Sequence, residues 1–218
     1  MHFNTLARNF YLQKDGATTS TQQDVGDQWP SLGVWHILPK SVSAELKTQN
    51  KTTANDMMQS LNEGNETILI FFHGSNTNRI VHKKFYNGMA GLDLHILAAD
   101  YRGFGDSTGN PTETGLYEDA HTIFNYVRIT APNKGIVLFG QSLGSGVATR
   151  LAADLSKTEF LLKGLILTAA FNNWNDEVSY SLKTTYSLTN YIPFFDEILR
   201  GANTRADLEV PTDRNINR

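Results

Sequence analysis

One serine carries the most specific chemical pattern in the sequence. Ser142 is the centre of the pentapeptide Gly-Gln-Ser-Leu-Gly at residues 140–144, which follows an apolar run at residues 136–139 and opens a stretch with helical apolar periodicity. In this strand-turn-helix setting, G-x-S-x-G is typical of a nucleophile elbow, a strained turn that exposes a reactive serine hydroxyl. We therefore predict that Ser142 is a catalytic nucleophile; the alternative is a tight turn without chemistry.

The residues around Ser142 match what such a turn requires. Gly140 and Gly144 are small enough to let the strand and the helix pass closely. The helix expected after Ser142 leaves the backbone N–H of Leu143 without an intrahelical partner, and the helix dipole favours negative charge there. This N–H is therefore predicted to stabilise the oxyanion of a tetrahedral intermediate.

A second loop supplies the other expected oxyanion donor. His73, Gly74 and Ser75 directly follow the apolar run at residues 68–72, and ligands gather at the carboxyl ends of strands in sheets of this kind. We predict that the backbone N–H of Ser75 is the second donor. His73 is predicted to shape the loop by hydrogen-bonding its backbone, and a role as general base is the alternative.

A third loop, at residues 100–109, combines glycines with short polar and charged side chains. This composition is typical of a tight turn. Its charged residues Asp100, Arg102 and Asp106 are predicted to form a structural hydrogen-bonded set rather than a catalytic one.

Apolar runs and helical periodicity place these loops in an alternating α/β chain. Strands are expected at residues 32–38, 68–72, 94–99, 136–139 and 165–168. One helix is expected between the third and fourth strands and another after the elbow, each with a shared apolar face: Leu116, Ala120, Ile123, Phe124 and Val127 in the first, and Leu143, Val147, Leu151 and Leu155 in the second. Such alternation predicts right-handed crossovers and a mostly parallel sheet with helices on both faces.

Polar composition predicts loops and one domain boundary. Residues 13–31 and 40–66 are rich in Thr, Ser, Gln, Asn and Asp, and they are expected to be loops or weakly ordered. The chain is accordingly divided into a polar N-terminal segment, residues 1–31, and an α/β domain, residues 32–218.

Charge and residue usage exclude several classes of function. The formal net charge is −3 at pH 7 and no run of Lys or Arg occurs, so nucleic acid is not an expected partner. The chain has no cysteine, which excludes disulfides and thiolate metal sites. No cofactor and no metal are expected. The apolar runs are shorter than a membrane span, which predicts a soluble or peripheral protein.

Together these motifs resemble the α/β-hydrolase superfamily, with H-G after a strand, D-Y-R-G-F-G-D-S at residues 100–107, and G-x-S-x-G in that order. More narrowly, residues 32–36, 100–107 and 140–149 are similar to the α/β-hydrolase-domain monoacylglycerol and lysophosphatidylserine lipases. The resemblance implies ester hydrolysis on single-chain lipids, with Ser142 as nucleophile and Ser75 and Leu143 as oxyanion donors. It also implies association with the endoplasmic reticulum membrane.

The family order of catalytic residues, serine then acid then histidine, is incomplete in this sequence. No histidine follows Ser142, and Val210-Pro211 resembles the approach to the strand that carries the acid. We therefore expect an α/β-hydrolase domain without its last strands and predict that this chain is nearly inactive. Asp176 is a candidate acid or a surface carboxylate, and the aromatic residues between Phe171 and Phe195 are candidates for an acyl channel or for helix packing.

Three functions remain open from the sequence. The first is a serine esterase of the monoacylglycerol lipase or lysophospholipase type, with a lipid ester as substrate and a membrane surface as a further partner. The second is an inactive isoform or pseudoenzyme that binds lipid or a protein. The third is an acyl-peptide hydrolase or a thioesterase, because the elbow does not select a leaving group.

Overall fold

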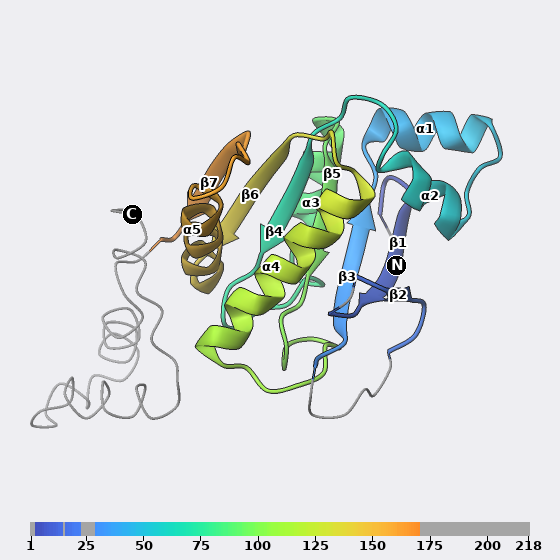
Figure 1. Cartoon of the computed structure of the whole chain (residues 1–218). Coiled ribbons are helices and arrows are strands. Elements are labelled where there is room, and N and C mark those ends of the chain that lie inside the picture. The colour runs from blue at the N-terminus through green and yellow to red at the C-terminus, as the bar shows by residue number, and fades with distance from the viewer. Residues whose placement is uncertain (1–2, 15, 23–28, 171–218) are drawn as a thin grey trace, which may run out of the picture.

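The strands of the protein form one mixed sheet in the order β2-β1-β3-β5-β4-β6-β7 (Figure 1). The computed structural model describes residues 3–14, 16–22 and 29–170. The strands are β1 (Ala7–Leu12), β2 (Thr18–Thr19), β3 (Leu32–Ile37), β4 (Ile68–Phe72), β5 (His95–Ala99), β6 (Ile136–Gln141) and β7 (Gly164–Thr168).

Parallel and antiparallel strands occupy different parts of this sheet. The neighbours β5, β4, β6 and β7 run parallel to one another, whereas β2, β1 and β3 add antiparallel strands beside β5. Parallel neighbours require crossover connections, which helices provide here. The expected α/β-hydrolase fold is confirmed, and the expected strands appear with bounds that differ by up to two residues.

Five helices are described: α1 (Lys40–Thr48), α2 (Ala54–Ser60), α3 (Lys83–Gly91), α4 (Glu113–Thr130) and α5 (Leu143–Leu155). Figure 1 shows α4 and α5 on one face of the sheet and α3 on the other. Strand β4 has helices on both sides because its alternate side chains point to opposite faces of the sheet. Ile68, Ile70 and Phe72 belong to the core cluster with α4 and α5, while Leu69 and Phe71 pack with α3.

The apolar faces predicted for α4 and α5 are confirmed. Every residue of both predicted sets is buried: Leu116, Ala120, Ile123, Phe124, Val127, Leu143, Val147, Leu151 and Leu155. In α4 the N-terminus is also capped, since Thr112 Oγ1 accepts a hydrogen bond of 3.0 Å from the backbone N–H of Gly115.

The prediction that residues 40–66 are a loop is wrong, because this stretch contains α1 and α2. Both helices are short and expose most of their surface, so few apolar residues were available to indicate them. Their buried apolar residues are Leu46 and Met57, which form a small cluster with Leu38. In α2, a capping box between Thr53 and Asp56 stabilises the first turn.

The polar N-terminal segment contributes strand β1, which the sequence did not indicate. Arg8, Phe10 and Leu12 alternate with less buried residues and face the core. The buried arginine disguised the strand, because a charged residue at a core position breaks the apolar alternation expected of strands. Residue 31 as a domain boundary stays a prediction, although β1 pairs with β3 across the whole strand.

Candidate active site

Ser142 occupies a single-residue turn between β6 and α5. Its backbone angles are φ 50° and ψ −120°, a region that residues with a side chain rarely adopt. The Ser142 N–H donates a hydrogen bond of 2.9 Å to Thr168 O, and Ser142 O accepts bonds from the N–H and hydroxyl of Ser145 at 2.7 and 2.6 Å. Contacts on both sides therefore hold the strained turn.

The two glycines of the pentapeptide lie where no side chain fits. A Cβ on Gly140 would lie 2.7 Å from Ser145 Cα, and a Cβ on Gly144 would lie 2.8 Å from His73 O and overlap with Phe72 O. Strand β4 and helix α5 therefore approach each other at backbone distance. This close approach is the reason that the elbow needs glycine two residues before and two residues after the serine.

The loop after β4 lies directly against Ser142. A Cβ on Gly74 would lie 3.3 Å from Ser142 Cβ and 3.8 Å from Ser142 Oγ. Ser75 follows Gly74 in this loop. Within the described part of the chain, neither the N–H of Ser75 nor that of Leu143 has a hydrogen-bond acceptor. Two free backbone donors next to a serine hydroxyl suit an oxyanion, and this role stays a prediction.

His73 is fully buried and bonds to its own loop. Its Nδ1 lies 2.8 Å from Gly74 O, so Nδ1 carries the proton and donates it to this carbonyl. Burial lowers the pKa of His73 to about 4, which keeps the ring neutral at pH 7. Its Nε2 lies 3.5 Å from Asp100 Oδ1, on the side away from its bond with Gly74. This geometry agrees with a loop-shaping imidazole rather than with a base for Ser142.

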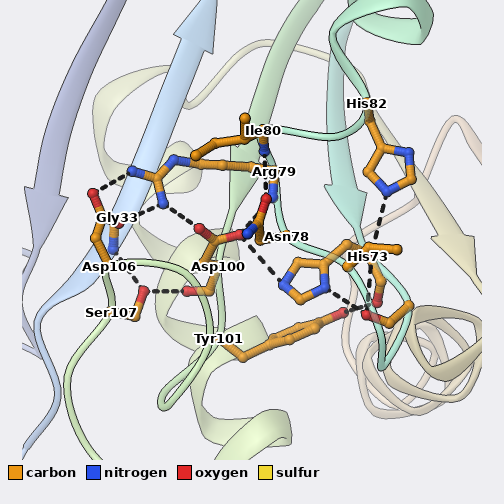
Figure 2. A network of polar contacts seen from close by, with 12 residues as sticks. Gly33, His73, Asn78, Arg79, Ile80, His82, Asp100, Tyr101, Asp106 and Ser107 are labelled. Carbon is orange, nitrogen blue, oxygen red and sulfur yellow. Dashed lines mark hydrogen bonds and ion pairs between the residues drawn. The ribbon is translucent and has the colours of Figure 1, made fainter.

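Arg79, which the sequence did not indicate, connects three segments near the site (Figure 2). Its backbone N–H donates to Asp100 Oδ1 at 2.6 Å, and its guanidinium donates to Asp100 Oδ2 and to both carboxylate oxygens of Asp106. The same guanidinium donates to Asn9 Oδ1 in β1, while Tyr11 OH donates to Asp106. Burial raises the pKa of Asp100, and the cation of Arg79 opposes that rise.

The predicted set of Asp100, Arg102 and Asp106 therefore does not form one network, and its members belong to two separate groups of hydrogen bonds. Asp100 and Asp106 share Arg79, whereas Arg102 donates to the buried Asp119 at 2.7 Å and to Glu118 at 3.0 Å. The available signal for Arg79 was indirect. Two aspartates in one tight turn require a cation, and Arg79 is the basic residue that the loop after β4 offers.

The comparison with known families decides the classification. The family described as "Serine aminopeptidase, S33" (Hydrolase_4) matches residues 63–204, which include β4, the elbow and α5. The chain belongs to this family of α/β-hydrolases.

Relatives with curated names match most of this chain. Lysophosphatidylserine lipase ABHD12 of Gallus gallus is 28% identical over 211 residues, which cover 95% of this chain and 50% of the relative. Protein ABHD12B of Homo sapiens is 33% identical over 188 residues, which cover 85% and 50% respectively. The chain thus spans about half the length of the curated relatives that it matches.

Solved structures show the same α/β-hydrolase fold. The α/β-hydrolase of Vibrio vulnificus has a TM-score of 0.61 at 18% identity, covering 95% of this chain and 59% of that one. A carboxyl esterase of Bacillus coagulans has a TM-score of 0.52 at 17% identity, covering 84% and 51%. At these identities the likeness concerns the fold alone.

Several predicted features of the hydrolase site lie outside the described residues. These are Asp176, the aromatic residues between Phe171 and Phe195, and Val210-Pro211. Within the described ranges, no hydrogen bond joins a histidine to Ser142, and no group of three or more His, Asp or Glu side chains is arranged to hold a metal. In the same ranges, no helix is long and apolar enough to cross a membrane.

Proposed function

We propose that Ser142 is the nucleophile of a carboxylic ester hydrolase that acts on single-chain lipid esters. The strained backbone of Ser142, between a strand and a helix that meet at glycines, is the observation that carries the proposal. A turn without chemistry has no need of a serine in this conformation, which costs of the order of 1–3 kcal/mol. This conformational cost is better explained if the turn presents the Ser142 hydroxyl to a substrate.

The geometry supports a two-step acyl transfer. Ser142 Oγ attacks the ester carbonyl carbon while a general base takes its proton, and the resulting oxyanion accepts hydrogen bonds from the N–H groups of Ser75 and Leu143. Collapse of this intermediate breaks the bond to the alcohol, which leaves with the proton. Water then attacks the acyl-serine by the same route and releases the fatty acid.

The substrate class is proposed from the relatives. Several of them are named lysophosphatidylserine lipases, and these match almost the whole of this chain. Monoacylglycerol and lysophospholipids share one acyl chain and an ester carbonyl, so one elbow serves both. Association with the endoplasmic reticulum membrane is part of the same proposal.

A non-catalytic function is the second candidate, and one observation favours it. In the described part of the chain no histidine contacts Ser142 through a hydrogen bond. A serine hydrolase without its base keeps only the residual acceleration from the oxyanion hole and binding. The domain would then bind a lipid or a protein without turning it over.

Labelling with a fluorophosphonate tests the two candidates. The 218-residue chain and the full product of its gene are each treated with the probe and assayed on lysophosphatidylserine and monoacylglycerol. We expect labelling and hydrolysis in the full product, lost in Ser142→Ala and retained in Ser41→Ala, an exposed serine of α1. Absence of Ser142 labelling in the full product would favour the binding function.

The oxyanion donors have a separate test in the same assay. Ser75→Pro deletes the backbone N–H, whereas Ser75→Ala keeps it. We expect Ser75→Pro to lower kcat by about 10²–10³-fold and Ser75→Ala to leave it nearly unchanged. Equal kcat values for the two variants would mean that another donor stabilises the oxyanion.

A further inference from the structure

Two neighbouring aliphatic side chains are exposed on the loop after β4. Ile80 is 51% exposed and Val81 is 66% exposed. Both belong to a turn in which the N–H of Ile80 donates to Asn78 Oδ1 at 3.0 Å and the N–H of Val81 donates to Asn78 O at 3.2 Å. Single exposed apolar residues are common, whereas contiguous exposed apolar surface marks interaction sites.

The turn is held from beneath, so the aliphatic pair stays at the surface. Arg79, between Asn78 and Ile80, is only 3% exposed and binds Asp100 and Asp106 (Figure 2). A buried arginine with several charge-assisted hydrogen bonds fixes the backbone of its neighbours. Ile80 and Val81 therefore cannot turn inward without breaking this cluster.

Positive charge accompanies the aliphatic pair. Lys83 and Lys84 follow it in the first turn of α3, and within the described residues neither forms an ion pair with a carboxylate. No Asp or Glu occurs anywhere from residue 67 to residue 92, although the whole chain has a net charge of −3. Burial lowers the pKa of His82, which favours its neutral form. The local charge therefore suits an anionic partner.

The exposed pair lies on the loop that forms one wall of the Ser142 site. This loop begins at His73, directly after β4, and ends at α3; its second residue, Gly74, packs against Ser142. It leaves β4 at the carboxyl edge of the sheet, where the elbow also lies, because β4 and β6 are parallel neighbours. A surface bound there would lie at the same edge of the molecule as the serine.

We propose that Ile80, Val81, Lys83 and Lys84 form a docking patch for an anionic lipid bilayer. The aliphatic side chains enter the boundary between head groups and acyl chains, and the two ammonium groups attract the negatively charged head groups. The patch extends the proposed function, since it names the surface from which a lipid ester would reach Ser142. Bilayer binding itself requires no hydrolysis.

Flotation of the 218-residue chain with phosphatidylcholine vesicles, with and without phosphatidylserine, tests the patch. We expect binding to the vesicles that contain phosphatidylserine, weakened as the salt concentration rises. Lys83→Gln/Lys84→Gln should lower the vesicle partition coefficient by roughly tenfold or more. Ile80→Ser/Val81→Ser should lower it on the same vesicles by a similar factor.

Leu92→Ser is the matched control, because Leu92 is 67% exposed at the opposite end of α3. It should bind vesicles as the unsubstituted chain does, and thermal unfolding of each variant verifies that the fold is retained. The proposal is overturned if the chain binds neither kind of vesicle, if binding does not depend on phosphatidylserine, or if Leu92→Ser loses as much binding as the patch variants. None of these results depends on whether Ser142 is catalytic.

Discussion

The strained backbone of Ser142 persists because its neighbours lack side chains. Gly74, Gly140 and Gly144 each face backbone or the serine itself at distances that leave little or no room for a Cβ. The cost of the serine conformation is therefore offset by close packing between β4, β6 and α5. At the residue scale, the geometry of the site depends on the missing Cβ atoms of these glycines as much as on the side chains that are present.

Gly144→Ala should destabilise the protein by about 3 kcal/mol, because the new methyl group meets the carbonyl oxygens of Phe72 and His73, which cannot move independently of the sheet. Gly88→Ala is the control. A Cβ on Gly88 in α3 meets nothing within 4 Å, so this variant should gain about 0.5–1 kcal/mol from helix propensity. Urea unfolding measures both, and equal stability of the two variants would contradict the packing argument.

At the scale of elements, Arg79 links segments that are not joined by β-sheet hydrogen bonds. It joins the loop after β4 to Asn9 in β1 and to Asp100 and Asp106 after β5. The loop that carries Ser75 is thus tied at one end by His73 and at the other by Arg79. This arrangement keeps the carboxyl edge of the sheet ordered around the serine.

Arg79→Met should lower the free energy of unfolding by about 3–5 kcal/mol, because Asp100 is left as a buried carboxylate without its cation. Arg150→Met is the matched control, since the 36% exposed Arg150 pairs with Asp154 on the surface of α5 and should cost less than about 1 kcal/mol.

The double variant Arg79→Met/Asp100→Asn identifies the cause of the loss. Removing the unpaired charge should recover part of the stability that Arg79→Met loses, as measured by a double-mutant cycle. Strictly additive effects of the two substitutions would show that the ion pair is not the reason for the destabilisation.

At the scale of the whole molecule, a buried row of hydrogen-bonded arginine and histidine side chains crosses the sheet from β1 to β5. Arg8 Nε donates to His36 Nδ1 at 3.2 Å, so His36 carries its proton on Nε2 and donates it to His95 Nδ1 at 3.0 Å. His95 Nε2–H is then buried without a partner among the described residues. Arg8 also donates to Tyr126 OH of α4 at 2.7 Å.

Stability should therefore decrease as the pH falls from 6.5 towards about 5. Burial, together with the charge of Lys134, lowers the pKa of His95 to about 3; burial also depresses the pKa values of His36 and His73. In this pH range these histidines bind protons in the unfolded chain and not in the folded chain, so a lower pH favours unfolding. Each such histidine contributes a slope of about 1.4 kcal/mol per pH unit.

Urea unfolding at a series of pH values measures this slope. His95→Gln should flatten it by the contribution of one histidine. A stability that is independent of pH between 6.5 and about 5 would mean that the buried imidazoles are protonated in the folded state.

Local patterns in the sequence determined the elbow, the strands β3 to β7 and the buried faces of α4 and α5. Each of these depends on residues close together in the chain: an apolar run of strand length, a repeat of three to four residues, or two glycines around one serine. Resemblance at the same motifs also determined the superfamily, which the match over residues 63–204 confirmed.

Only the tertiary structure decided the rest. Strand β1 and helices α1 and α2 have weak local signals, and they form because the sheet and a small cluster around Leu38 offer them a surface. The roles of Arg79 and Arg8 rest on partners up to 118 positions away in the sequence. A buried charge is stable only beside its partners, and the fold alone brings those partners together.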